Sequence, residues 1–235
     1  MRICIPITTA TTQQALTKIK QGFALAKMLE LRIDGIQKVD LKKLLADNKG
    51  EILVTNRVKE EGGAFVGGER ERVALLKKAV ALGCDYVDLE IRTEEALILE
   101  LKKKIADYHG RTKLILSYHN LERTPGLKTL RKKMAEGYKA GADIVKIVPY
   151  AQQMEDNLTV LSLIPYAQKK SLQIIAFCMG EKGMISRIIS PLMGSYLTYA
   201  SLEKGEESAP GQMTVEEIRQ VLWILENKGQ LDKNI

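Results

Sequence analysis

A single lysine interrupts an apolar run in the second half of the chain. Lys146 lies in Gly-Ala-Asp-Ile-Val-Lys-Ile-Val-Pro, and its neighbours from Ile144 to Pro149 are all apolar. Such a run is typical of a strand buried on both faces, where an ammonium is costly and the free amine is favoured. A free amine can attack a ketone and form an imine. We therefore predict that Lys146 is a nucleophile. A structural lysine paired with a buried carboxylate is the alternative.

The chain has only two histidines, and they fall on opposite ends of one expected strand. His119 closes the run Lys-Leu-Ile-Leu-Ser-Tyr-His, whereas His109 precedes it. Imidazole can accept and donate a proton near neutral pH, so a histidine at the catalytic end of a strand can act as acid and base. We predict this role for His119, with a structural histidine as the alternative.

Charged residues occur at alternate positions in two other expected strands. Glu30 and Arg32 share one side of Met-Leu-Glu-Leu-Arg-Ile-Asp, and Asp88 and Glu90 repeat the pattern. Arg57 closes a third strand. Buried charges must be paired or bound to a polar ligand, so this pattern indicates a polar site. A network of ion pairs that holds the strands together is the alternative.

Two later segments carry groups suited to an anion. Arg187 follows the seventh expected strand, and a guanidinium can bind a carboxylate through two parallel hydrogen bonds. The polar segment Glu203–Gln212 follows the eighth, and we call it the mouth loop. Its Gly205 and Gly211 permit hinge-like backbone changes. We expect this loop to be mobile without ligand and ordered over it, with a plain turn as the alternative.

Short apolar runs alternate with longer segments of helical periodicity, and these elements must position the reactive residues. The expected strands are Arg2–Ile7, Met28–Ile33, Ile52–Asn56, Tyr86–Ile91, Lys113–Tyr118, Asp143–Val148, Leu172–Phe177 and Ser195–Tyr199. The expected helices include Glu71–Leu82, Glu94–Tyr108, Leu127–Ala140 and Val215–Leu225.

This alternation predicts an α/β fold, an eight-stranded parallel (β/α)8 TIM barrel formed by residues 1–235 as a single domain. A dinucleotide-binding sheet is the competing architecture, but no G-x-G-x-x-G follows the first strand. In such barrels the carboxyl ends of the strands carry the chemistry. Lys146, His119 and the charged strand residues are therefore expected at one mouth.

Composition limits the possible environment and partners. The net charge of +7 comes from basic runs spread over expected helices, such as Lys102–Lys104 and Arg131–Lys133, which favours solvated faces over a nucleic-acid-binding stripe. A positive field would also attract a small anionic substrate. Three scattered cysteines, no long apolar run and no signal peptide favour a cytoplasmic protein without a membrane partner. Two histidines are too few for a typical zinc site, so no metal is expected.

Taken together, these segments resemble the type I 3-dehydroquinate dehydratases. Each is short, but their order and spacing on successive expected strands match the family over nearly the whole chain. The matching segments are Glu30–Asp34, Arg57 with Glu61–Gly63, Asp88–Glu90, Ser117–Asn120, Gly141–Lys146, Ile185–Arg187 and Ser208–Gln212.

The resemblance implies a lyase of the shikimate pathway that makes 3-dehydroshikimate from 3-dehydroquinate. It implies that Lys146 forms an imine with the substrate ketone. His119 would then remove a proton from the adjacent carbon and protonate the departing hydroxyl, and Glu61 would hold this histidine in position.

The resemblance also implies which residues contact the substrate, whether a cofactor is needed, where the protein is located and how it assembles. Glu30, Arg32 and Arg57 resemble residues that bind the ring hydroxyls, and Arg187 resembles a carboxylate clamp. Ser208 and Gln212 would close over the substrate. No metal or organic cofactor is implied, and a cytoplasmic homodimer is expected.

One departure from the family and two other interpretations stay open from the sequence. The first strand ends in Cys4-Ile-Pro-Ile-Thr-Thr, whereas family members can place a substrate-contacting serine there, so that contact is in doubt. A lysine-imine barrel of the aldolase type would also need Lys146. A catalytically inactive binding barrel is the second interpretation.

Overall fold

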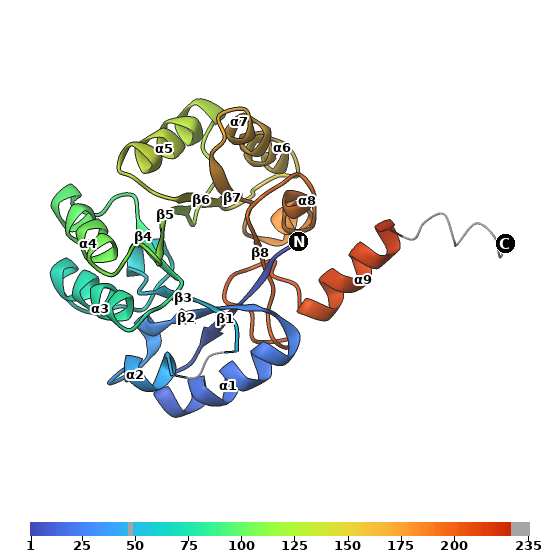
Figure 1. Ribbon diagram of the computed structural model, residues 1–235. Coiled ribbons are helices and arrows are strands. Elements are labelled where there is room, and N and C mark those ends of the chain that lie inside the picture. The colour runs from blue at the N-terminus through green and yellow to red at the C-terminus, as the bar shows by residue number, and fades with distance from the viewer. Residues whose placement is uncertain (47–48, 227–235) are drawn as a thin grey trace.

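The computed structural model describes residues 1–46 and 49–226, in which parallel strands alternate with helices around a central sheet (Figure 1). The strands are β1 (Ile3–Thr8), β2 (Met28–Arg32), β3 (Glu51–Thr55), β4 (Tyr86–Glu90), β5 (Lys113–Asn120), β6 (Ile144–Pro149), β7 (Gln173–Ala176) and β8 (Thr198–Tyr199). The α-helices are α1 (Thr12–Leu25), α2 (Leu41–Leu44), α3 (Glu69–Ala81), α4 (Glu95–Asp107), α5 (Leu127–Lys139), α6 (Asp156–Leu161), α7 (Leu163–Gln168), α8 (Met184–Leu192) and α9 (Val215–Glu226). Short 3-10 turns cover Ile33–Gly35, Lys59–Glu61 and Glu181–Gly183.

The eight strands form one parallel sheet that is nearly closed. Their order is β7-β6-β5-β4-β3-β2-β1-β8, so each strand pairs with its neighbour in the chain and β8 pairs with β1. Across the remaining gap, the Tyr196 amide donates to the Ile174 carbonyl over 2.7 Å. This arrangement confirms the predicted (β/α)8 barrel.

The expected strands are all present, and the largest difference is in the eighth. The sequence predicts a strand over Ser195–Tyr199, whereas β8 covers only Thr198–Tyr199. The Ser195 hydroxyl contacts the β7 backbone, accepting from the Ala176 amide at 3.3 Å, and also donates to the Leu197 carbonyl at 3.1 Å. The Ser195 side chain therefore takes the place of backbone hydrogen bonds beside β7, and the regular strand β8 starts only at Thr198.

Side-chain caps explain where several helices begin. The Thr11 hydroxyl accepts a hydrogen bond from the Gln14 amide at the start of α1. Before α9, the Thr214 hydroxyl accepts from the Glu217 amide, and the Glu217 carboxylate accepts from the Thr214 amide. Such reciprocal capping satisfies amides that have no partner within the helix.

Inside the barrel, the inward-facing side chains form layers contributed by alternate strands. The lowest layer holds four apolar or aromatic residues, which are Met28, Tyr86, Ile144 and Leu197. The middle layer is also apolar and holds Cys4, Leu53, Ile115 and Ile175. The third layer, nearest the carboxyl ends of the strands, holds Glu30, Asp88, Lys146 and Tyr199, all at most 5% exposed. Three of these four side chains carry ionisable groups that barrel interiors normally exclude.

Polar aromatic contacts close the opposite end of the barrel. The hydroxyls of Tyr86 and Tyr196 lie 2.7 Å apart, and the Arg2 guanidinium donates to both. The Lys113 ammonium lies over both rings. The barrel floor is therefore filled by side chains from β4, β5 and the segments just before β1 and β8.

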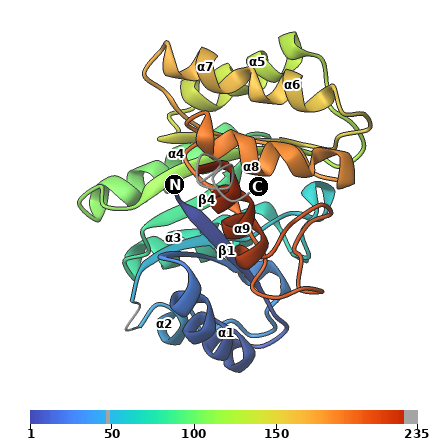
Figure 2. The same cartoon turned by 90° about the vertical axis from the view of Figure 1, so that its right-hand side faces the viewer.

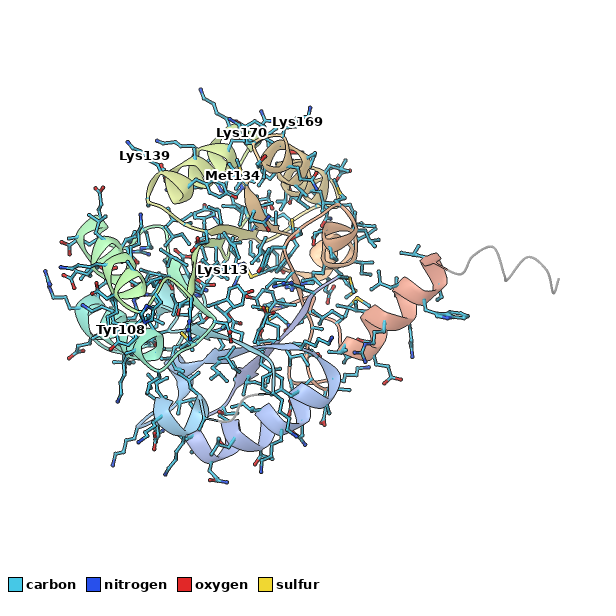
Figure 3. The ribbon with its side chains drawn as sticks, viewed as in Figure 1. Tyr108, Lys113, Met134, Lys139, Lys169 and Lys170 are labelled. Atoms are coloured by element: carbon cyan, nitrogen blue, oxygen red, sulfur yellow. The ribbon has the colours of Figure 1, made fainter. Side chains whose placement is uncertain are left out.

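Several lysines at the ends of helices lie on the outer surface. Figure 3 shows Lys139, Lys169 and Lys170 pointing away from the barrel, at the outer ends of α5 and α7. These lysines contribute to the net charge of +7 but do not lie around the mouth of the barrel. Within residues 1–46 and 49–226, no helix has the length and apolar character needed to cross a membrane.

Candidate active site

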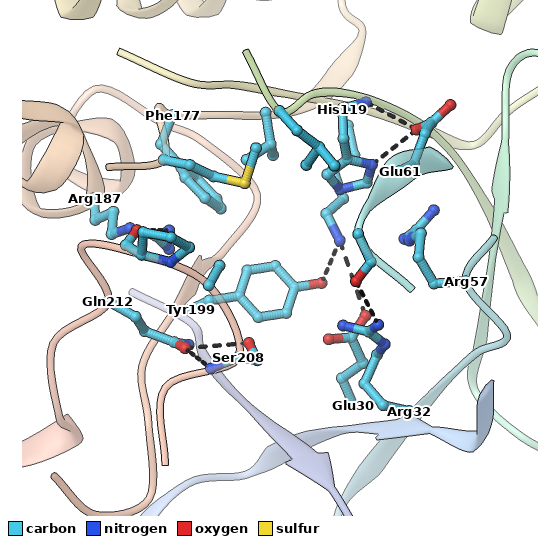
Figure 4. Close-up of a pocket in the computed structure, with 17 residues that line it drawn as sticks. Glu30, Arg32, Arg57, Glu61, His119, Phe177, Arg187, Tyr199, Ser208 and Gln212 are labelled. Carbon is cyan, nitrogen blue, oxygen red and sulfur yellow. Dashed lines mark hydrogen bonds and ion pairs between the residues drawn. The ribbon is translucent and has the colours of Figure 1, made fainter. Parts of the chain in front are cut away.

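A cavity of about 210 Å³ opens at the carboxyl ends of the strands. It is built above the third layer, and Figure 4 shows Arg187 and His119 on opposite sides with the Tyr199 ring between them. The lining residues are Glu30, Arg32, Arg57, Glu61, Gly62, His119, Leu121, Lys146, Val148, Phe177, Met179, Arg187, Tyr199, Ser208, Ala209, Pro210 and Gln212. This volume suits a small molecule rather than a polymer.

Lys146 is the central group of the third layer. Its Nζ atom lies 3.1 Å from an Asp88 carboxylate oxygen, 3.9 Å from Glu30 and 3.1 Å from the Tyr199 hydroxyl. The sequence suggested either a reactive amine or a lysine paired with a carboxylate. The described contacts show that Lys146 is paired and also lines the cavity, so its ion pairs do not separate it from a ligand.

Arg57 supports this layer from the side of β3. Its guanidinium lies 2.8 Å from Asp88 and 2.9 Å from Glu90, and it donates to the Ser117 hydroxyl at 2.6 Å. These carboxylates raise the pKa of Arg57 above its usual value. The opposing effects of burial and of Arg57 leave the pKa of Asp88 lowered, so Asp88 stays ionised beside Lys146. The ion-pair network considered from the sequence is therefore present here.

His119 lies on β5 at the edge of the cavity and is held by Glu61. One Glu61 carboxylate oxygen accepts from the His119 amide at 2.9 Å and lies 3.0 Å from ring Nδ1. Burial, then the positive charges of Arg57 and Lys146, lower the pKa of His119 well below its usual value, so the ring is neutral at pH 7. A proton on Nδ1 leaves Nε2 as a free base. Burial raises the pKa of Glu61 to about 7.

Arg187 extends from α8 to the other side of the cavity. It is 1% exposed, and its guanidinium lies over the Phe177 ring and donates to the Pro210 carbonyl at 3.3 Å. No carboxylate in residues 1–46 and 49–226 forms an ion pair with it, and its Nε–H has no acceptor there. Burial lowers the pKa of Arg187 to about 10, so the group is still charged at pH 7. A buried cation without a counterion is suited to an anionic ligand.

The mouth loop lies over the cavity and contacts Arg187 through Pro210. The Gln212 side-chain oxygen accepts from the Ser208 amide and hydroxyl, at 2.8 and 3.1 Å. The Gln212 amide nitrogen is buried and lacks an acceptor in the described chain. Gly211 has a φ of 74°, and a Cβ there would come within 2.1 Å of the Gly180 carbonyl oxygen. Glycine is therefore required for this close approach.

The residues predicted for the site come together in this cavity. Lys146, His119 and Glu61 line it, as do all six predicted substrate contacts, which are Glu30, Arg32, Arg57, Arg187, Ser208 and Gln212. Their chemical roles remain predictions. Arg32 also makes two hydrogen bonds to Asp34, at 2.9 and 2.8 Å. His109 is exposed and does not line the cavity, as its place before β5 predicted.

Two features of the cavity go beyond the sequence analysis. The sequence left the contact from the first strand in doubt, and neither a residue of β1 nor Thr9 lines the cavity. Tyr199 was not predicted, although it ends the eighth strand and therefore stands at the mouth. An aromatic residue at a strand end is also a common core residue, so its type alone gave no signal. Residues 1–46 and 49–226 contain no group of three or more His, Cys, Asp or Glu side chains arranged to hold a metal ion.

Comparisons with known proteins match this chain over nearly its whole length. The type I 3-dehydroquinase family model matches residues 3–228. The chain is 38% identical over 218 residues to a 3-dehydroquinate dehydratase from Desulfotalea psychrophila, covering 93% of this chain and 95% of the relative. It is 33% identical over 226 residues to one from Methanocaldococcus jannaschii, covering 96% and 100%. The crystal structure of 3-dehydroquinate dehydratase from Geobacillus kaustophilus matches with a TM-score of 0.87 at 28% identity, covering 96% and 91%.

Arg187 and Arg72 offer a test of whether the unpaired guanidinium serves a ligand. Both are 1% exposed, but Arg72 forms an ion pair with Glu90 and Arg187 has no such partner among the described residues. Arg187→Met should leave the free energy of unfolding unchanged or raise it by up to about 3 kcal/mol, because it removes a desolvated charge. Arg72→Met should lower it by about 3–5 kcal/mol, since Glu90 loses a partner.

Urea unfolding of the two variants and the native chain measures both changes. An equal loss of stability in the two variants would show that the Arg187 guanidinium is structural.

Proposed function

Because the chain belongs to the type I 3-dehydroquinase family, we propose that it dehydrates 3-dehydroquinate to 3-dehydroshikimate through an imine on Lys146. The observation that carries this proposal is that one cavity joins a buried lysine, a neutral histidine and an unpaired buried arginine. Family membership also favours this reaction over the aldolase-type alternative.

In the first step, the Lys146 nitrogen adds to the substrate ketone, and loss of water gives a protonated imine. The positive imine nitrogen withdraws electrons and makes the adjacent C–H acidic. Imine formation therefore splits one difficult elimination into easier steps. Asp88 and Glu30 support this step because their negative charges lie beside the nitrogen in both the ammonium and the protonated imine.

His119 supplies the proton transfers. Its lowered pKa keeps Nε2 unprotonated, so the ring can take the proton from the carbon next to the imine. The resulting imidazolium then protonates the departing hydroxyl, which leaves as water. Glu61 holds the ring through Nδ1, and its ionised form stabilises the imidazolium. Hydrolysis of the product imine regenerates Lys146.

The cavity wall provides the groups that orient the substrate. Arg187 binds the carboxylate, because it is the buried guanidinium without a carboxylate partner in the described chain. Gln212 adds a donor from the mouth loop. The groups proposed to contact the ring hydroxyls are Glu30, Arg32 and Arg57. Arg57 already binds Asp88 and Glu90, so it has fewer free N–H groups to offer.

Borohydride trapping separates the proposed roles of Lys146 and His119. With 3-dehydroquinate and borohydride, the native chain should gain a reduced adduct on Lys146, detected by mass spectrometry. Lys146→Ala should give neither adduct nor product. His119→Ala should still form the imine but release product about two to four orders of magnitude more slowly, because proton transfer is lost.

Lys113→Ala is the matched control, since this lysine lies on the neighbouring strand at the opposite end of the barrel. Lys113→Ala should give as much adduct on Lys146 as the native chain and should turn over the substrate at the native rate. Substantial turnover by Lys146→Ala would exclude the imine, and native turnover by His119→Ala would exclude His119 as the acid and base. A native chain that binds the substrate without converting it would instead be the inactive binding barrel.

The mouth loop is proposed to open for substrate entry and to close during the reaction. Among the described residues, three polar contacts hold it to the rest of the chain, which are Gly180 with Pro210, Arg187 with Pro210, and Lys18 with Glu206. Because these contacts are few, local opening is expected to cost little free energy.

Hydrogen exchange of residues 203–212 tests this movement. Exchange should be fast in the free chain and slower with 3-dehydroshikimate bound, because the ligand adds contacts to Gln212 and Arg187. The loop 108–112, which precedes β5 at the opposite end of the barrel, serves as a control that should not change. Equal exchange with and without ligand would mean that the loop is a fixed turn.

We also propose a cytoplasmic enzyme that needs no metal or organic cofactor and binds neither nucleic acid nor membrane. Its three cysteines are buried and free, which supports a reducing compartment. The proposed reaction uses His119 as acid and base and Lys146 as nucleophile, so its steps need no group from outside the chain. The basic runs are spread over separate helices, such as Lys102–Lys104 on α4 and Arg131–Lys133 on α5, which supports the proposal that no nucleic acid is bound.

A homodimer is proposed through the apolar surface of α8 and α9. These helices contact each other, and Figure 2 shows them side by side with α9 in front of the barrel. Large apolar side chains on this surface are 37% to 56% exposed, namely Met184, Ile185, Leu192, Trp223, Ile224 and Leu225. Exposed apolar side chains gathered on adjacent elements are typical of protein contact sites.

Sedimentation velocity of charged variants tests this surface. Ile185→Lys and Ile224→Lys should each shift the chain toward monomer, because burying an unpaired ammonium is unfavourable. Leu158→Lys on α6 is the control, since Leu158 is 71% exposed and lies on another helix. A native chain that sediments as a monomer would exclude the dimer.

A further inference from the structure

We propose that Tyr199 is a catalytic residue that relays protons between Lys146 and the ketone oxygen while the imine forms and hydrolyses. This proposal rests on the proposed function of the same site. It adds a step, because His119 and Glu61 account for proton transfer at carbon but not for the conversion of the ketone oxygen into water.

Tyr199 is placed for this role by the short β8 strand. It pairs with Cys4 of β1, and its ring lies edge-on to Phe177 with centroids 6.0 Å apart. The ring is 4% exposed, and its hydroxyl lies 3.1 Å from Lys146 Nζ. Figure 4 shows the Tyr199 hydroxyl directed across the cavity, away from Arg187 and toward the side of Glu30 and Arg57. The ring position is therefore fixed by packing, and the hydroxyl touches the reacting nitrogen.

The proton balance of imine formation calls for such a group. A ketone and a lysine ammonium give a protonated imine and one water, so two ammonium protons must reach the ketone oxygen. One ammonium proton passes to the Tyr199 oxygen, which frees the nitrogen lone pair to bond to the carbonyl carbon, and the Tyr199 O–H proton passes to the ketone oxygen. This gives the N-protonated carbinolamine. A second relay moves another N–H proton to the carbinolamine hydroxyl, and the C–O bond breaks as the nitrogen lone pair forms the C=N bond, which releases water and leaves the protonated imine.

The other neighbours of Lys146 are less suited to the relay. Asp88 does not line the cavity, and its carboxylate is occupied by Arg57 and by the Ser117 hydroxyl at 2.6 Å. Glu30 accepts from the Thr55 hydroxyl at 2.6 Å, and an ionised carboxylate has no proton to donate. A tyrosine hydroxyl is both donor and acceptor. Burial and the nearby Glu30 raise the pKa of Tyr199 above its usual value, so its proton is present at pH 7.

Rapid mixing followed by borohydride quenching tests the relay in Tyr199→Phe. The rate at which the adduct on Lys146 appears should fall about a hundredfold, a typical size for loss of general acid–base catalysis. The same factor should apply when 3-dehydroshikimate is the ketone, because the relay works in both directions and His119 is not needed there. Product formation should slow in parallel.

Tyr86→Phe is the matched control, since it removes another buried tyrosine hydroxyl at the floor of the barrel. Its rate of adduct formation should be native. Circular dichroism and thermal unfolding check each fold, and Tyr199→Met replaces Tyr199→Phe if the latter does not fold.

The outcomes separate this proposal from the proposed function. His119→Ala should form the adduct at the native rate and then fail to convert it, whereas Tyr199→Phe should be slow at the earlier step. A native rate of adduct formation in Tyr199→Phe, or an equal loss in Tyr86→Phe, overturns the relay alone. If the native chain gives no adduct with either ketone, both proposals are wrong.

Discussion

The ion pair between Lys146 and Asp88 is the contact on which the site depends. An ammonium in the third layer of a barrel would be strongly destabilising without a counterion, and Asp88 provides one at 3.1 Å. Asp88 in turn stays ionised because Arg57 lies 2.8 Å away, and Arg57 also binds Glu90. The charges are therefore mutually dependent. The two apolar layers beneath them supply the packing that a polar third layer cannot.

The fold and most of the site were predictable because they follow from local patterns. Apolar runs that alternate with helical periodicity give eight strands, and strand polarity brings Lys146 and His119 to one mouth. The exact partners were not predictable. Whether Arg57 binds a ligand or Asp88 depends on tertiary distances, and the shortening of the last strand depends on one Ser195 hydroxyl. Tyr199 escaped prediction because aromatic residues at strand ends are usually core residues.

Two arginines show how burial can serve opposite purposes in one barrel. Arg72 on α3 binds Glu90 and Thr93, so its hydrogen bonds tie this helix to the carboxyl end of β4. Arg187 is equally buried but rests on the Phe177 ring and a backbone carbonyl, and it keeps donor capacity without an acceptor in the described chain. Packing energy elsewhere must offset this unfavourable desolvation. An anionic ligand that pairs with the Arg187 guanidinium would remove this unfavourable term, and the gain would contribute to the free energy of binding.

The filled floor of the barrel has a consequence for traffic through the cavity. Below the third layer, two tiers of side chains and the Tyr86–Tyr196 contact occupy the interior, so molecules reach Lys146 from the side of the mouth loop. The cavity is therefore closed at its lower end. The ketone substrate, the product and the water exchanged at the imine all pass through the same opening, so the rates of substrate binding and product release cannot be changed independently. Any change that makes the loop a better seal for the intermediate also lengthens the stay of the product.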